Sequence, residues 1–133
     1  MQEPIINSAT YEVVIGSTAQ SKFILPDDAI LRGKEIVGVA IRNQNSAGSS
    51  VTVSGRTLVS NVALDAAFVN LFQDSKAIIQ DCPASYFVPN YRQGEYTPVE
   101  IKQFSPSTSY IRFADSSRIA NNQAVEITFY YID

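Results

Sequence analysis

The side chains that usually carry chemistry are scarce in this sequence. Its 133 residues include no histidine and one cysteine, Cys82. Zinc sites and nucleophilic triads draw their ligands or their base from histidine and cysteine, so neither chemistry has its usual groups here. Cys82 follows the apolar pair Ile78 and Ile79 and precedes Pro83. We therefore interpret it as a packed structural thiol, and a single cysteine excludes an internal disulfide.

Acidic side chains offer a second chemistry, the paired carboxyl groups of a glycoside hydrolase. The candidates are Asp81, Glu95, Glu100 and Asp115. Such enzymes hold two carboxyl groups at a set separation across the glycosidic bond, and the sequence spacing brings no two of these together. Calcium also takes oxygen ligands, but the acidic stretches 26–28 and 113–117 match no calcium-loop motif and read as solvated turns. We expect no enzymatic activity, no metal and no cofactor.

The segment SYFVPNYRQGEY at 85–96 gathers aromatic side chains in a loop interrupted by Pro and Gly. Aromatic rings pack in cores, and Tyr and Arg are enriched at protein interfaces. Three interpretations stay open. The rings cover the open end of a core, anchor a protein interface, or stack on a sugar. The candidate residues in this loop are Tyr86, Phe87, Tyr91, Arg92 and Tyr96.

The elements that would position these residues are β-strands, because apolar and polar residues alternate with a period of two. The strand-like segments are 11–16, 21–26, 35–44, 50–60, 66–72, 77–83, 108–114 and 124–133, and one more strand starts near Val99. For residues 61–82 a hairpin with its turn at 73–76 is favoured over a helix capped by Asn61. About eight strands with turn signals every ~8–12 residues predict an all-β fold. We expect one domain over 1–133, an antiparallel β-sandwich resembling a jelly roll.

Two strands predict close contacts. On 35–44, Gly38 and Ala40 share a face, so another sheet or subunit is expected to pack near them. The last strand, 124–133, divides into two faces. Its core face is assigned Val125, Ile127, Phe129 and Tyr131, and its outer face Glu126, Thr128, Tyr130 and Ile132. A purely solvated face would not favour Tyr130 beside Ile132, so these two are candidates for contact with a neighbouring subunit.

The charge balance narrows the possible partners. Charged residues make up 17% of the chain, below the ~25% usual for soluble domains, which favours an assembled subunit. The ten Lys and Arg residues are scattered, whereas nucleic-acid binding needs clustered positive charge, so none is expected. No apolar run approaches the ~20 residues of a membrane span, and the first residues lack the features of a signal peptide.

Three stretches together resemble a known family. They are LRGKEIVGVAIRNQ at 31–44, AAFVNLFQDSKAIIQDCPASYF at 66–87 and SYIRFADSSRIANNQAVEITFYYID at 109–133. Their order is similar to the single jelly-roll structural proteins of tailless icosahedral bacteriophages. The resemblance implies a capsid, vertex or spike-base subunit, assembled in the host cytoplasm into the virion, with further copies and other virion proteins as partners.

Members of that family often carry a basic internal arm that meets the genome. The first ten residues here hold no Lys or Arg, so no genome contact is expected of this chain. A different class of function stays open as the alternative. A carbohydrate-binding or receptor-binding β-sandwich would use the aromatic loop, with Tyr91 as its test residue and a glycan as its ligand.

Overall fold

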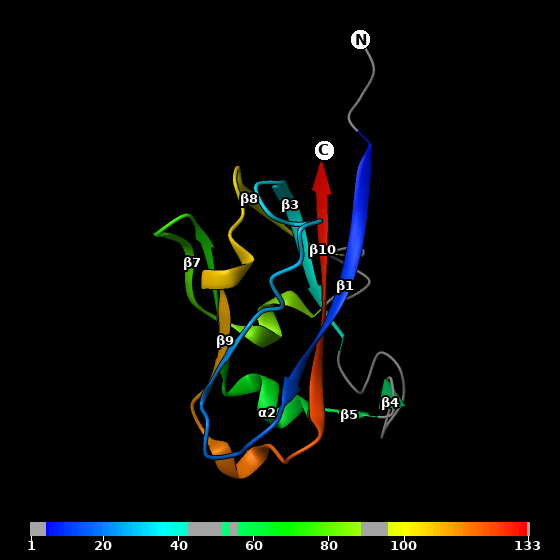
Figure 1. Cartoon of the computed structure of the whole chain (residues 1–133). Coiled ribbons are helices and arrows are strands. Elements are labelled where there is room, and N and C mark those ends of the chain that lie inside the picture. Colours follow the sequence, from blue (N-terminus) through cyan, green and yellow to red (C-terminus); the bar gives the residue numbers. More distant parts are fainter. Residues whose placement is uncertain (1–4, 43–51, 54–55, 89–95, 133) are drawn as a thin grey trace.

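The computed structural model describes residues 5–42, 52–53, 56–88 and 96–132, which form two packed β-sheets (Figure 1). The larger sheet contains β1 (Ile6–Ile15), β3 (Glu35–Ile41), β4 (Thr52–Val53), β5 (Arg56–Leu58), β8 (Thr97–Ile101) and β10 (Gln123–Ile132). The smaller sheet contains β2 (Lys22–Ile24), β6 (Ala67–Gln73), β7 (Lys76–Pro83) and β9 (Tyr110–Phe113). The short helices are α2 (Asn61–Asp65), η1 (Ala84–Phe87), η2 (Pro106–Thr108) and η3 (Ser116–Arg118).

The strand order confirms the predicted all-β sandwich. The smaller sheet runs β2-β9-β6-β7, and the larger runs β4-β5-β10-β3-β8, with β1 on β10. The first strand therefore pairs with the last, antiparallel from Ile6 opposite Ile132 to Ile15 opposite Gln123. Without the two short strands β4 and β5, each sheet contains four strands. Their order in the two sheets is that of a jelly roll.

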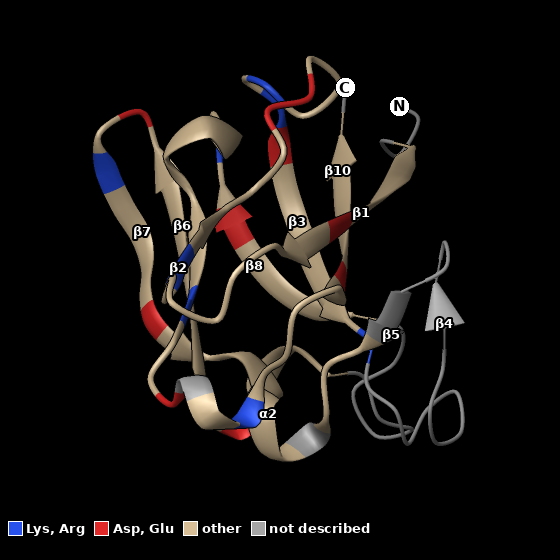
Figure 2. Ribbon diagram, turned by 60° about the horizontal axis from the view of Figure 1, so that its bottom comes forward, with Lys and Arg blue, Asp and Glu red and all other residues tan. Residues whose placement is uncertain are grey.

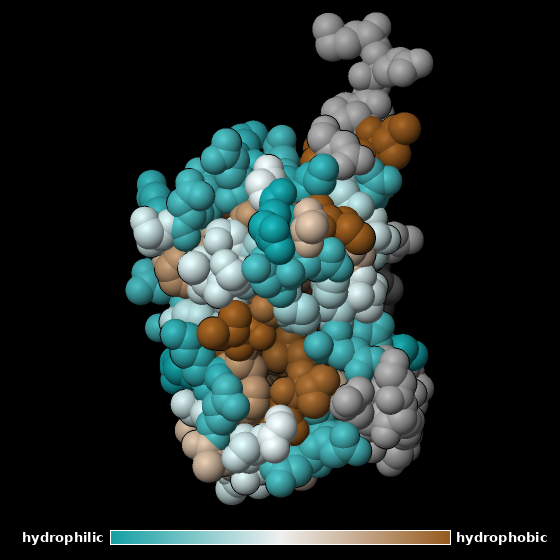
Figure 3. All heavy atoms as spheres, viewed as in Figure 1, coloured by the Kyte–Doolittle hydropathy of each residue, from teal (hydrophilic) through white to brown (hydrophobic). Residues whose placement is uncertain are grey.

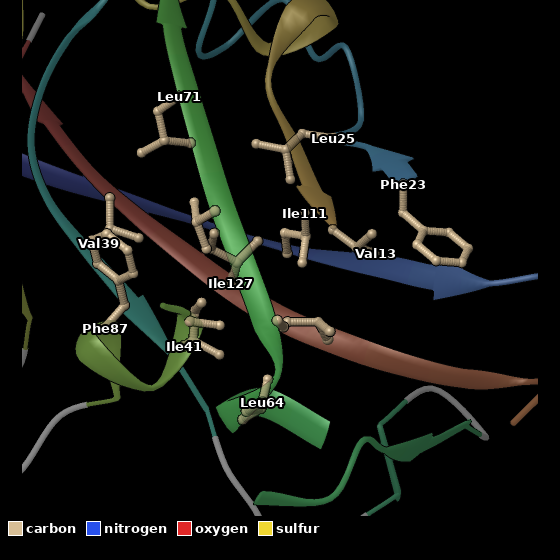
Figure 4. Packing of buried hydrophobic residues seen from close by; sticks show 14 of the residues in the cluster. Val13, Phe23, Leu25, Val39, Ile41, Leu64, Leu71, Phe87, Ile111 and Ile127 are labelled. Carbon is tan, nitrogen blue, oxygen red and sulfur yellow. The ribbon is translucent and has the colours of Figure 1, made fainter. Parts of the chain in front are cut away.

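The core lies between the two sheets, because alternate residues of each strand point inward. On β10 the predicted inward residues Val125, Ile127 and Phe129 are at most 1% exposed, and Tyr131 packs partly buried against the same cluster. Figure 4 shows Val39 and Ile127 of the larger sheet facing Leu71 of the smaller. The assignment of the two faces of the last strand is confirmed.

Residues 61–82 contain both elements that the sequence left open. The helical interpretation holds for α2 alone, where the Ser60 hydroxyl accepts the Ala63 N–H at 3.1 Å, so Ser60 is the cap rather than Asn61. The remainder is the favoured hairpin, β6 with β7. Its turn places Asp74 at φ +55°, a left-handed conformation that Asp tolerates better than most residues.

Candidate interaction surface

Two tyrosines that are far apart in the sequence stack on the outward face of the larger sheet. The ring centroids of Tyr96 and Tyr130 are 4.4 Å apart, and the rings are inclined by 28°. Tyr130 points outward because its neighbour Phe129 fills the core. Opposite Tyr130 on β3 lies Gly38, and a Cβ added there would overlap the Tyr96 ring. The close packing predicted at Gly38 is therefore made by a tyrosine of the same chain.

Uncharged residues surround this stack. One cross-strand row runs Pro98, Gly38, Tyr130, Ser8, and the next runs Ala40, Thr128, Thr10. The hydroxyls of Thr10 and Thr128 are hydrogen-bonded at 2.8 Å. We name this surface the outer tyrosine face, defined by Ser8, Thr10, Gly38, Ala40, Tyr96, Pro98, Thr128 and Tyr130.

Charged residues border the outer tyrosine face at its two ends. At one end Arg42 pairs with Glu126 at 3.3 Å. At the other, the Lys102 ammonium lies 3.1 Å from the Glu35 carboxylate. Figure 2 shows the charged positions of β3 and β8 near the strand ends, with uncharged ribbon between them. The arrangement is an apolar and hydroxyl-bearing centre with a charged rim, as at protein interfaces.

Ile132 extends the outer tyrosine face along β10. It lies on the same side of β10 as Tyr130 and is partly exposed. Across the sheet it pairs with Ile6 of β1, whose side chain is 48% exposed. The candidates Tyr96, Tyr130 and Ile132 are thus brought onto one surface by β8 and β10.

The aromatic loop residues separate from one another in the structure. Phe87 is fully buried in η1 and belongs to the core, as the core-covering interpretation expects. Tyr86 is 56% exposed and meets the Phe87 ring edge-on, with centroids 5.5 Å apart. The Thr97 hydroxyl donates to the Tyr86 carbonyl at 3.0 Å, which fastens η1 to the start of β8. Tyr91 and Arg92 lie outside the described residues.

The other sheet carries cation–aromatic pairs that the sequence analysis did not identify. Lys22 Nζ lies 4.2 Å from the Tyr110 ring centroid, and the Arg112 guanidinium lies 4.8 Å from that of Phe68. Tyr110 and Arg112 are two residues apart on β9 and therefore lie on the same face of the strand. This period of two was the signal that the sequence offered. The pairing with β2 and β6, which brings each cation onto a ring, depends on strand order and leaves no local trace in the sequence.

Carboxylates considered for catalysis are engaged with near neighbours. Asp115 accepts hydrogen bonds from the Ser117 hydroxyl at 2.6 Å and the Ser117 N–H at 3.0 Å. These bonds, the hydroxyl first, lower the pKa of Asp115, and the Arg118 charge acts in the same direction. Glu100 lies 3.5 Å from Lys102 Nζ. Glu95 lies outside the described residues.

Asp81 belongs to a structural bridge between β6 and β7. The buried Asn70 side chain accepts the Asp81 N–H at 2.9 Å and donates to its carboxylate at 3.2 Å. Arg112 adds a 3.4 Å contact to the same carboxylate. Cys82, the next residue, is partly buried against the core, and burial raises the pKa of its thiol. Within the described ranges, no group of three or more Cys, Asp or Glu side chains is arranged to hold a metal ion.

Comparison with protein families, with curated proteins and with solved structures found no match. Over the described part of the chain, no helix combines the length and the apolar character needed to cross a membrane.

Proposed function

We propose that this protein is a structural subunit of a virion, and that it acts by associating with further copies of itself and with other virion proteins. The outer tyrosine face carries the proposal. A solvated sheet face usually presents polar and charged residues. This face instead presents stacked tyrosines with Pro and Thr over the buried Gly38 and Ala40, and interface centres are likewise rich in aromatic residues and poor in charge.

The architecture supports the proposal by analogy. Jelly rolls form viral capsid domains, but they also form lectin domains and cupins, so the fold alone does not select a function. The sequence resemblance to bacteriophage virion proteins favours the first of these. The scattered Lys and Arg residues favour contacts with protein over contacts with the genome. On this proposal the subunit assembles in the host cytoplasm.

The test separates assembly from folding. Replacing Tyr130→Ser together with Ile132→Ser removes apolar area from the outward face and leaves the inward residues of β10 in place. We expect assembly, measured by sedimentation velocity over a range of concentrations, to weaken more than thermal stability. Tyr110→Ser is the matched control, because it removes a half-buried tyrosine from the outward face of the other sheet.

Two results would count against the proposal. One is a native chain that stays monomeric at every concentration, even with the other virion proteins present. The other is a double variant that loses folding and assembly to the same extent.

The alternative is a carbohydrate-binding or receptor-binding module, and the exposure of Tyr86 favours it. Tyr86 is 56% exposed, whereas the rings of Tyr96 and Tyr130 stack and so each covers one face of the other. A sugar-binding surface needs open aromatic faces. Glycan-array binding that is lost on Tyr86→Ala or Tyr91→Ala, and kept on Tyr110→Ala, would support this module over the structural subunit.

A further inference from the structure

Within the part of the chain that the structure describes, β1 is a ten-residue edge strand without the usual protection of an edge. It pairs along its whole length with β10, and the described part of the chain places no strand on its other side. Alternate residues of an edge strand direct backbone N–H and C=O groups outward. Proteins usually block such edges with Lys, Pro or a bulge. β1 contains no Lys or Pro, its one charged residue is Glu12, and its register with β10 is continuous.

An apolar groove lies beside the second half of β1. It runs between β1 and β2, the outermost strands of the two sheets, and has a volume of about 580 Å³. Its apolar lining consists of Val13, Val14, Phe23, Ile24 and Pro26. Val14 is 39% exposed and Ile24 57% exposed. Figure 3 shows apolar side chains gathered where β1 and the segment carrying β2 run side by side.

The first half of β1 carries the complementary feature. Ile5 is 78% exposed and Ile6 48% exposed, and Figure 3 shows apolar atoms beside the start of the strand. Ile6 and Val14 lie eight residues apart on the same face, about 26 Å at strand spacing. One strand thus has projecting apolar side chains at one end and an apolar groove at the other.

We propose that two copies of this protein pair antiparallel through β1, about a two-fold axis at Thr10. This inference rests on the proposed function, since it names one contact by which the subunit self-associates. In this register Ile6 of each copy lies opposite Val14 of the second copy, beside the groove. Ser8 lies opposite Glu12, and Thr10 lies opposite its own equivalent. The larger sheet then continues from one copy into the other.

Charge and side-chain type select this register. A two-fold axis at Glu12 would place two carboxylates opposite each other, and like charges directly across a pair are destabilising. The axis at Thr10 pairs the exposed apolar residues with each other and places two threonines together, which is a favourable cross-strand pair. It also joins the Thr10–Thr128 rows of both copies, so the two outer tyrosine faces become one continuous surface.

The contact adds a long strand pair to the larger sheet. In this register the nine residues from Ile6 to Val14 pair in each copy, over about 30 Å at strand spacing. The outward backbone groups of both β1 edges are then hydrogen-bonded to each other.

A charge-pair experiment tests the register in the full chain. The single variant Ile6→Lys places a Lys opposite Val14, and the single variant Val14→Glu places a Glu opposite Ile6. Each mismatch occurs twice in the dimer. We expect each to raise the dimer dissociation constant about tenfold or more. The double variant I6K/V14E faces Lys with Glu at both ends and should recover most of the affinity. Val62→Lys, which changes an exposed valine of α2, is the matched control and should leave the constant unchanged. Circular dichroism confirms the fold of each variant.

Cross-linking gives a second measurement. In a Cys82→Ser background, Thr10→Cys should form an intermolecular disulfide under mild oxidation, because the residue on the axis faces itself. Ser8→Cys should not, because it faces Glu12.

The outcomes are distinguishable. Self-association that is unaffected by both single charge variants, or that they weaken without rescue in the double variant, overturns the β1 contact and leaves the proposed function standing. A native chain that remains monomeric at every concentration and with the other virion proteins present overturns both.

Discussion

At the residue scale, Gly38 and Tyr96 show how a small residue can be required by a distant one. The sequence predicted that something packs near Gly38, since a glycine in a strand interior gives up side-chain packing. It could not identify Tyr96, because 58 positions separate the two residues and only the pairing of β3 with β8 brings them together. The composition of a strand indicates where a close approach occurs, and the fold decides what approaches.

We expect Gly38→Ala to destabilise the protein by about 1–3 kcal/mol, because the added methyl group displaces the Tyr96 ring. Chemical denaturation measures the change. In a Tyr96→Ala background the same substitution should be neutral or stabilising, since the obstacle is gone and alanine restricts the unfolded chain more than glycine does. An equal loss in both backgrounds would contradict this account.

Tyr11 provides a prediction for high pH. Burial first, and then the Asp28 carboxylate, raises the pKa of its hydroxyl from 10.0 to about 12. Between these values the folded state holds a proton that the unfolded state has released, so stability is full below about pH 10 and falls as the pH rises towards 12. The denaturation midpoint should drop over this window.

Tyr11→Phe should remove the part of the fall in the denaturation midpoint between about pH 10 and 12 that Tyr11 causes. It should also cost little stability at neutral pH, because the phenyl ring keeps the packing and the buried hydroxyl, although burial and the nearby Asp28 carboxylate raise its pKa, makes no hydrogen bond of good geometry among the described residues. A pH dependence that is identical in the variant would exclude Tyr11 as its source.

At the element scale, turns were easier to predict than bulges. Residues 73–76 carried turn chemistry, and the hairpin of β6 and β7 followed from it. The register shifts between the two strands were not predictable, because a bulge is defined by how many residues of a partner strand it opposes. Asp81, at φ +49°, lies in the irregular part of this pair. Its neighbour across the sheet, Asn70, is 2% exposed and supplies the hydrogen bonds that hold it.

Asn70→Ala should cost about 1–3 kcal/mol of unfolding free energy, because it leaves the Asp81 N–H without the acceptor that now satisfies it. Asp81→Asn should cost less, since it keeps that N–H and a residue type that tolerates positive φ. Thermal unfolding of the two variants gives the comparison. The account would fail if Asp81→Asn were the more damaging change.

At the scale of the whole molecule, the alternation of residues predicted the sandwich and the inward face of β10, but placed the start of the first strand five residues late. The sequence suggested a beginning at Tyr11, whereas β1 begins at Ile6. Residues 6–10, INSAT, lack a clear alternation and are held as a strand by pairing with β10. The same gap hid the first half of the edge strand, whereas the residues that line the groove lie mostly in the segments 11–16 and 21–26, which were predicted as strands.

If the outer tyrosine face and the β1 edge serve separate contacts, their effects on assembly should add. Val14 pairs with Ala124, six residues from Tyr130 along β10, so the two substituted residues lie about 20 Å apart. Tyr130→Ser combined with Val14→Glu should therefore lower the free energy of assembly by the sum of the single losses, within about 0.5 kcal/mol. Sedimentation equilibrium measures each value. A combined loss well below the sum would mean one shared contact.

The pairing of the first strand with the last also has a mechanical consequence. Ile6 and Ile132 lie opposite each other at one end of the β1–β10 ladder, where β1 begins and β10 ends (Figure 1). A force that pulls Ile6 away from Ile132 would load the backbone hydrogen bonds of the ladder one after another. A force applied along β1 against β10 would load them all at once. The protein should thus resist sliding of β1 along β10 far better than separation of Ile6 from Ile132.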